Sequence, residues 1–187
     1  MDIVVLLPIL AFLALAAGLL VVFRRTDRIV ARTREVEGFR ASVRDLAVRV
    51  EASLAGATER IDAVRHNTLP PAALADTLTA ATDAVERYVD EARELKPPTQ
   101  GRSIRSELIA DLERAGRALA MVEHGTTILV NVRRGNRELE GQTSLKRGYL
   151  NLLHARDAIA RHAAAAQDLV AVPPEPRTSS GAAPDGP

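Results

Sequence analysis

The 187-residue sequence contains no cysteine and no tryptophan. Without cysteine the chain has no disulfide bond and no thiolate metal site, which agrees with a location in the reducing cytoplasm. Outside the first 23 residues the only aromatic side chains are Phe39, Tyr88 and Tyr149. A core so poor in aromatics and rich in Ala, Leu and Val favours closely packed helices over a sheet or a deep ligand cavity.

The sequence also lacks an excess of charge of one sign. It has 25 Lys and Arg against 24 Asp and Glu, a formal net charge of +1. A nucleic-acid-binding protein or a binder of acidic substrates usually carries a clear basic excess. We therefore expect no nucleic-acid partner.

The common sequence motifs of catalysis are missing as well. No glutamate stands three residues before a histidine, so the Glu-x-x-His pairs of di-iron helical bundles are absent. The sequence has neither a phosphate-binding loop nor a nucleophile elbow. We expect no catalytic residue, no metal and no cofactor. A metal- or phosphate-dependent enzyme remains the third functional hypothesis.

The longest uncharged stretch of the chain runs from Ile3 to Phe23. A helix rises about 1.5 Å per residue, so this stretch spans roughly 30 Å, the thickness of a bilayer hydrocarbon core. A cleaved signal peptide would have a basic start and a shorter apolar centre. We therefore predict that residues 1–23 are a transmembrane anchor, which makes the chain a single-pass protein of the cell membrane.

Basic residues follow this stretch and do not precede it. Basic residues mark the cytoplasmic side of a span, so we expect the N-terminus outside and the bulk of the chain in the cytoplasm. Residues 24–37 are predicted to be a basic juxtamembrane helical stalk. Arginines close to a bilayer gain from anionic headgroups, although the topology signal alone also accounts for them. The predicted lipid-headgroup contacts are Arg24, Arg25, Arg28 and Arg32.

Beyond the stalk, apolar residues recur at three- and four-residue spacing along four segments, which is typical of bundled helices. Short connections make sequence neighbours antiparallel. The predicted fold class is all-α: a single N-terminal transmembrane helix continuing into an antiparallel up-down four-helix bundle or coiled-coil domain, residues 38–171. A disordered Pro/Gly/Ser-rich tail, residues 172–187, is expected to follow. The expected core positions include Val36, Phe39, Val43, Leu46, Val50, Leu54, Ala57, Ile61 and Val64; Leu74, Leu78, Ala81, Val85, Tyr88, Ala92 and Leu95; Leu108, Leu112, Ala115, Leu119, Val122, Thr126 and Leu129; and Leu145, Tyr149, Leu152, Ile159, Ala163, Ala166 and Val170.

Three breaks separate the four helical segments. Prolines disfavour a helical residue before them, so the segments from His66 to Pro71 and around Pro97 are predicted turns. The polar stretch from Arg133 to Ser144 contains Gly135 and Gly141 and is predicted to be a loop. In an antiparallel bundle this loop and the first turn lie at the same end, away from the membrane.

Basic residues gather at the end that these two connections form. Such a basic tip suits contact with an acidic protein partner or with phosphate groups. A solvated loop whose charges keep this end soluble explains the same residues. The predicted partner-binding residues are Arg65, His66, Arg133, Arg134, Arg137, Lys146 and Arg147.

Two functional hypotheses follow from this organisation. In the first, the chain is a membrane-anchored cytoplasmic adaptor or scaffold that acts by protein–protein interaction without catalysis. In the second, it is a non-catalytic signalling module that relays the state of a membrane partner through the helix leaving the membrane. The adaptor hypothesis needs fewer missing parts, because the signalling hypothesis requires a separate sensor. The sequence leaves both the protein partner and formation of a homo-oligomer open.

Overall fold

The computed structural model describes the backbone of residues 3–131 and 137–170, and the side chains of these ranges from Val30 onward. Throughout this part of the chain the secondary structure is helical and no strand occurs, which confirms the all-α class. The α-helices are α1 (Ile3–Arg65), α2 (Ala75–Glu94), α3 (Arg102–Asn131) and α4 (Glu138–Gln167). Short 3₁₀ turns, η1 (Pro71–Leu74) and η2 (Thr99–Gly101), precede α2 and α3.

The chain divides into two compact units. The first comprises residues 1–33 and 170–187, and the second comprises residues 34–169. In the first unit, residues 3–33 are helical and belong to α1. The side chains of the predicted anchor, residues 1–23, and of Arg24, Arg25 and Arg28 lie outside the described part of the chain, whereas Arg32 is exposed. Among the residues whose side chains the structure describes, no helix is long and apolar enough to cross a membrane. The predicted tail, residues 172–187, also lies outside the described residues.

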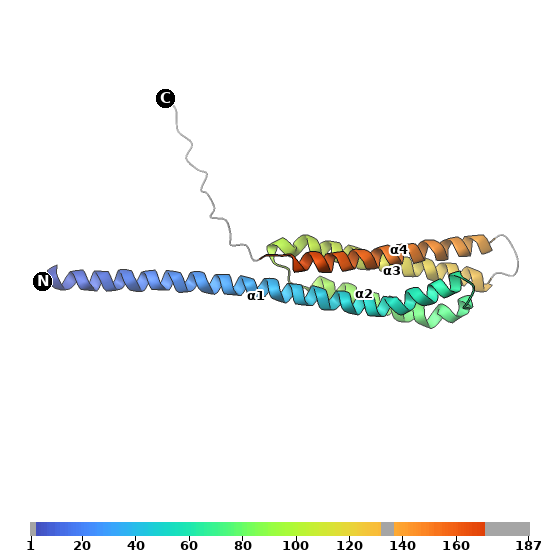
Figure 1. The fold of residues 1–187 in the computed structure, drawn as a ribbon, viewed down its shortest axis with the longest axis horizontal. Coiled ribbons are helices and arrows are strands. Elements are labelled where there is room, and N and C mark those ends of the chain that lie inside the picture. The colour runs from blue at the N-terminus through green and yellow to red at the C-terminus, as the bar shows by residue number, and fades with distance from the viewer. Residues whose placement is uncertain (1–2, 132–136, 171–187) are drawn as a thin grey trace, which may run out of the picture. The chain divides into compact units, whose positions relative to one another are not determined.

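The second unit, hereafter the bundle, holds the hydrophobic core. Within it α2, α3 and α4 lie alongside the later part of α1, each antiparallel to its sequence neighbour (Figure 1). Every predicted core position from Val36 to Val64 is buried, which confirms the stripe on α1. Val170 was predicted to close the stripe on the last helix, but it is 64% exposed because α4 ends three residues earlier, at Gln167.

The first helix ends at a capping motif built on Asn67. This residue has a φ of 56°, in the left-handed region that Asn tolerates better than most residues. Its backbone N–H donates to the Val64 carbonyl at 3.0 Å, and the N–H of Thr68 donates to the Ala63 carbonyl at 2.9 Å. These two bonds form a Schellman motif, which satisfies carbonyls that the helix end would leave unpaired. The predicted turn between His66 and Pro71 is therefore confirmed.

The prediction of a loop as far as Ser144 is wrong, because α4 already begins at Glu138. Gly141 and Gly148 are buried inside this helix and face α3. A Cβ atom at Gly148 would lie 2.8 Å from the Ala118 carbonyl oxygen, and one at Gly125 would lie 2.7 Å from the Leu145 nitrogen. The backbones of α3 and α4 thus approach too closely for larger side chains. The glycines serve a helix–helix contact and not a turn.

Whereas α3 and α4 pack through glycines, the contact between α4 and α1 includes hydrogen bonds from arginine side chains. Arg156 interrupts the apolar stripe of α4 and reaches across to α1. Its Nε donates to Glu51 Oε2 at 3.1 Å, and its Nη1 donates to Thr58 Oγ1 at 2.7 Å. Further along the seam, Arg40 donates to the Leu169 carbonyl. Side-chain hydrogen bonds therefore supplement apolar packing between these two helices.

Candidate docking cavity at the turn pole

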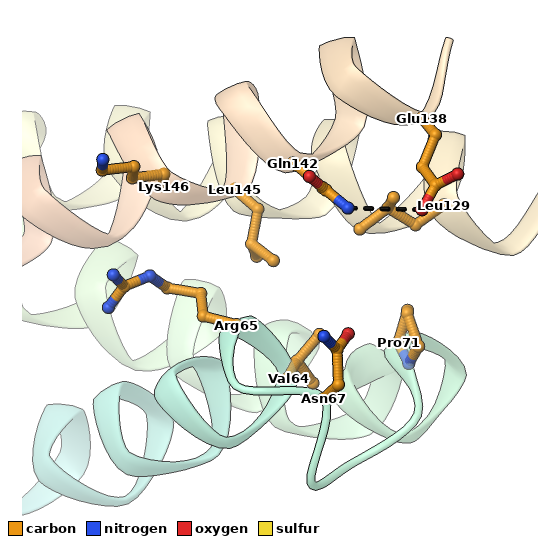
Figure 2. Close-up of a pocket in the computed structure, with 9 residues that line it drawn as sticks. All are labelled: Val64, Arg65, Asn67, Pro71, Leu129, Glu138, Gln142, Leu145 and Lys146. Atoms are coloured by element: carbon orange, nitrogen blue, oxygen red, sulfur yellow. Dashed lines mark hydrogen bonds between the residues drawn. The ribbon is translucent and has the colours of Figure 1, made fainter. Parts of the chain in front are cut away.

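The structure brings the turn after α1 close to the start of α4. The end of α1, η1, the end of α3 and the start of α4 meet at one end of the bundle, which we call the turn pole (Figure 1). A cavity of about 570 Å³ lies there, open to solvent on one side (Figure 2). Its lining comes from each of these segments: Val64, Arg65, Asn67, Pro71, Leu129, Glu138, Gln142, Leu145 and Lys146.

Aliphatic side chains from three helices lie beneath the cavity. Val64 and Leu145 are buried members of the core, and Leu129 is half-buried beside them. Val64 is the last core residue of α1 before the Asn67 cap, so the helix end itself sets one edge of the cavity. Val64 and Leu145 are only 4% and 2% exposed, so the half-buried Leu129 and Pro71 are the main apolar side chains open to the cavity, and polar atoms make up most of its accessible lining.

Arg65 is held at one side of the cavity by two contacts. Its guanidinium lies over the ring of Tyr149 in α4, with Cζ 4.3 Å from the ring centroid. Its Nη1 donates to Asp62 Oδ1 at 2.6 Å. A cation over an aromatic face and a paired carboxylate both restrict the rotamers of a long side chain. Arg65 therefore presents its charge in a defined place at the α1–α4 seam.

The opposite side of the cavity carries an acid. Gln142 donates to Glu138 Oε1 at 3.3 Å, one helical turn earlier on α4. Figure 2 shows Arg65 and Lys146 on one side of the cavity, Glu138 and Gln142 toward the other, and Leu145 between them. The lining is thus charge-polarised, with two cations toward one side and a carboxylate toward the other.

The structure brings only some of the predicted tip residues to this cavity. Arg65 and Lys146 line it. His66 is 66% exposed and turns back to the Asp62 carbonyl oxygen, 3.0 Å from its Nδ1. Arg137 pairs with Glu140 at 3.5 Å, and Arg147 is exposed. Arg133 and Arg134 lie outside the described residues.

Sequence reasoning missed three residues that shape the cavity. Tyr149 was assigned to the core alone, and Glu138 and Gln142 were placed in a loop. The four-residue spacing of Glu138 and Gln142 is a helical signal, but Gly135 before the pair and Gly141 inside it indicated a loop.

A second polar cluster lies between α3 and α4, away from the cavity. Asp111 is buried; its carboxylate pairs with Arg114 and lies 2.8 Å from His162 Nε2. The other ring nitrogen of His162 is 3.6 Å from Glu107 Oε2. Within the described ranges no three or more His, Asp or Glu side chains are arranged to hold a metal ion. The cluster satisfies a buried carboxylate and joins the end of α4 to α3.

These features define the described residues as part of an all-α helical protein with a charge-polarised cavity at the turn pole of its bundle. The chain matches no protein family model, no curated protein and no solved structure.

Proposed function

We propose that the chain is a membrane-anchored cytoplasmic adaptor that holds a protein partner at the turn pole and performs no catalysis of its own. The observation that carries this proposal is the cavity. It places the guanidinium of Arg65, held over Tyr149, together with Lys146, Glu138 and the half-buried side chains of Pro71 and Leu129, so that a partner of complementary charge would find a defined surface there.

The support for the anchor lies in the sequence. The uncharged stretch Ile3–Phe23 has the length of a membrane span, and arginines follow it directly. In this proposal the N-terminus is outside the cell, the bundle is cytoplasmic, and Arg24, Arg25, Arg28 and Arg32 contact lipid headgroups. The anchor sets where the partner is held, and the turn pole sets which partner is held.

Co-purification from native membranes tests the docking step. The tagged full chain should retain a partner that is lost with Lys146→Glu, which reverses a cation of the cavity. The matched control is Arg147→Glu, the same change at an exposed neighbour outside the lining. Surface substitutions rarely change stability by more than about 0.5 kcal/mol, so both variants should fold. Equal partner recovery with the two variants would contradict docking in the cavity.

One observation favours the signalling hypothesis as a second candidate. Glycines bring α3 and α4 into backbone contact, whereas arginine side chains bridge α4 to α1. Side-chain bridges re-form in new registers more easily than close backbone packing, so α1 is the helix best suited to shift. Because the chain has no cysteine, Glu51→Cys with Arg156→Cys allows a bismaleimide to lock this seam selectively. If the chain is an adaptor, the locked protein should still bind its partner. If the chain is a signalling module, the locked protein should no longer relay the state of its membrane partner.

A further inference from the structure

We propose that two copies of this chain pair in parallel through a groove between α1 and α4, with Val48 of each copy seated against the groove of the other. None of the residues that line this groove lines the cavity at the turn pole. The pairing therefore goes beyond the proposed adaptor function and does not depend on it. It follows from the composition of the groove, the position of Val48 and the charges on either side of that residue.

The groove lies between α1 and the second half of α4 and has a volume of about 320 Å³. Residues between Arg44 and Glu51 of α1 and between Arg156 and Ala163 of α4 line it. Its open lining is mostly apolar and comes from small side chains, because Ala47, Ala160 and Ala163 stand where larger residues would fill the space between the two helices. The groove is thus a shallow apolar depression that accepts a side chain from outside.

Val48 is the side chain that fits such a depression. It is 63% exposed and stands at the edge of the groove, midway between Arg44 and Glu51. In the described part of the bundle it is the only exposed large apolar side chain of α1. A two-fold axis parallel to the helices keeps each residue at the same height in both copies, so a projecting side chain and its depression must lie at one height. This chain meets that condition with itself.

The charges beside Val48 favour the same arrangement. Successive helical residues are about 100° apart, which puts Arg44 about 40° to one side of Val48 and Asp45 about 60° to the other. A two-fold axis sets one flank of a helix opposite the other flank of its copy, so Arg44 of each copy faces Asp45 of the other. Among the described residues Arg44 has no hydrogen-bond or ion-pair partner.

Asp45 is free to take part in this second pairing. Its side chain is 69% exposed and accepts from Arg49 Nε at 2.9 Å through Oδ2. A carboxylate has about four acceptor positions, so Asp45 can hold Arg49 of its own copy and Arg44 of the other at once. Two such pairs, related by the symmetry axis, would flank the apolar contact.

The size of the contact indicates a weak dimer. Ala41 and Ala55 lie seven residues before and after Val48 on the same side of α1, and their small side chains let a second helix approach. The strip from Ala41 to Ala55 is about 21 Å long, and two adjacent helices are about 20 Å wide. Roughly 400 Å² per copy is less than the 800 Å² or so of a stable complex. The pair should therefore form where copies are concentrated.

Thiol crosslinking of the purified full chain, concentrated in non-ionic detergent, tests the pairing, because the chain has no cysteine. Val48→Cys supplies one thiol per copy close to the proposed axis, and a short bismaleimide should join two copies into a covalent dimer on a denaturing gel. The matched control is Val130→Cys, the same change at a valine of α3 that is 53% exposed. It should give only the low yield of random collisions.

A charge placed in the groove should abolish the dimer. Ala160→Glu in the Val48→Cys chain adds a carboxylate to the apolar depression, whereas Ala165→Glu makes the same change at an exposed alanine of α4 outside the lining. Circular dichroism of the two variants checks that both keep their helices. Equal dimer yields from Val48→Cys and Val130→Cys, or a dimer that Ala160→Glu leaves undiminished, would overturn the inference.

Exchange of the flanking charges tests the two-fold arrangement itself. Arg44→Asp sets like charges opposite each other, and each partly exposed ion pair changes affinity by up to about fivefold. Loss of both pairs should weaken the dimer by roughly tenfold or more. Arg44→Asp combined with Asp45→Arg makes the facing charges opposite again and should restore the crosslinking yield; no recovery would contradict the parallel pairing. Because these variants leave the lining of the turn pole unchanged, failure here is separate from failure of the adaptor proposal.

Discussion

Arg65, on the last turn of α1, lies over the ring of Tyr149 in α4, with 4.3 Å between its Cζ atom and the ring centroid. The sequence placed the two residues in different roles, the arginine at a basic tip and the tyrosine in the core. The structure makes them one contact, which closes the α1–α4 seam beside the cavity. The same contact orients a cation of the lining, so the stability of the bundle and the geometry of the proposed docking site are coupled.

Replacing Tyr149 by leucine should lower the free energy of unfolding of the bundle. The change removes the aromatic face under Arg65, and a partly exposed cation–π contact contributes about 1 kcal/mol. Tyr149→Phe retains the face and should lie close to the unaltered protein. The midpoints of urea unfolding, compared at constant slope, measure the difference. Equal loss of stability in the two variants would mean that the phenol hydroxyl, and not the ring face, matters.

The bundle should fold without the rest of the chain. Residues 34–169 form one compact unit that contains the connected core. A fragment of these residues should therefore be soluble, highly helical by circular dichroism and cooperative in thermal melting. A soluble fragment with little helical signal would contradict the bundle. A cooperative fragment also provides the background for measuring stability without the predicted anchor.

Adding a methyl group at two different glycines should have opposite effects. Gly148→Ala places a Cβ atom 2.8 Å from the Ala118 carbonyl oxygen, so α3 and α4 must separate, at a cost of about 1–3 kcal/mol. Gly56 in α1 has nothing within 4 Å of an added Cβ, so Gly56→Ala should gain up to about 1 kcal/mol of helix propensity. Urea unfolding of the 34–169 fragment measures both changes. Stabilisation by Gly148→Ala would show that the helices do not pack as closely as described.

The sequence predicted the core of α1 well because its apolar spacing is nearly uninterrupted, and all the predicted core positions from Val36 to Val64 are buried. It failed at the start of α4, because a glycine such as Gly141 has the same local signature in a turn and in a close helix–helix contact. Only the position of α3 distinguishes a glycine in a turn from a glycine in a helix–helix contact.

The candidate site was predictable only in outline. Antiparallel topology is enough to bring the two connections to one pole, and Arg65 and Lys146 were named on that ground. The order of charges across the cavity depends on which way the side chains of α4 face. These side-chain directions follow from a helix that begins at Glu138. The sequence pattern indicated a loop at this position instead.

The central claim is that a protein partner is held at the turn pole, and site-specific photo-crosslinking in intact membranes tests it most directly. A benzophenone side chain at Leu139 stands on the first turn of α4 at this pole, where the residue is 74% exposed. The matched position is Leu150, 41% exposed on the same helix but eleven residues further from the pole. The account predicts a discrete partner adduct from position 139, lost with Lys146→Glu, and none from position 150. Adducts of equal yield from both positions, or an adduct at 139 that survives Lys146→Glu, would contradict it.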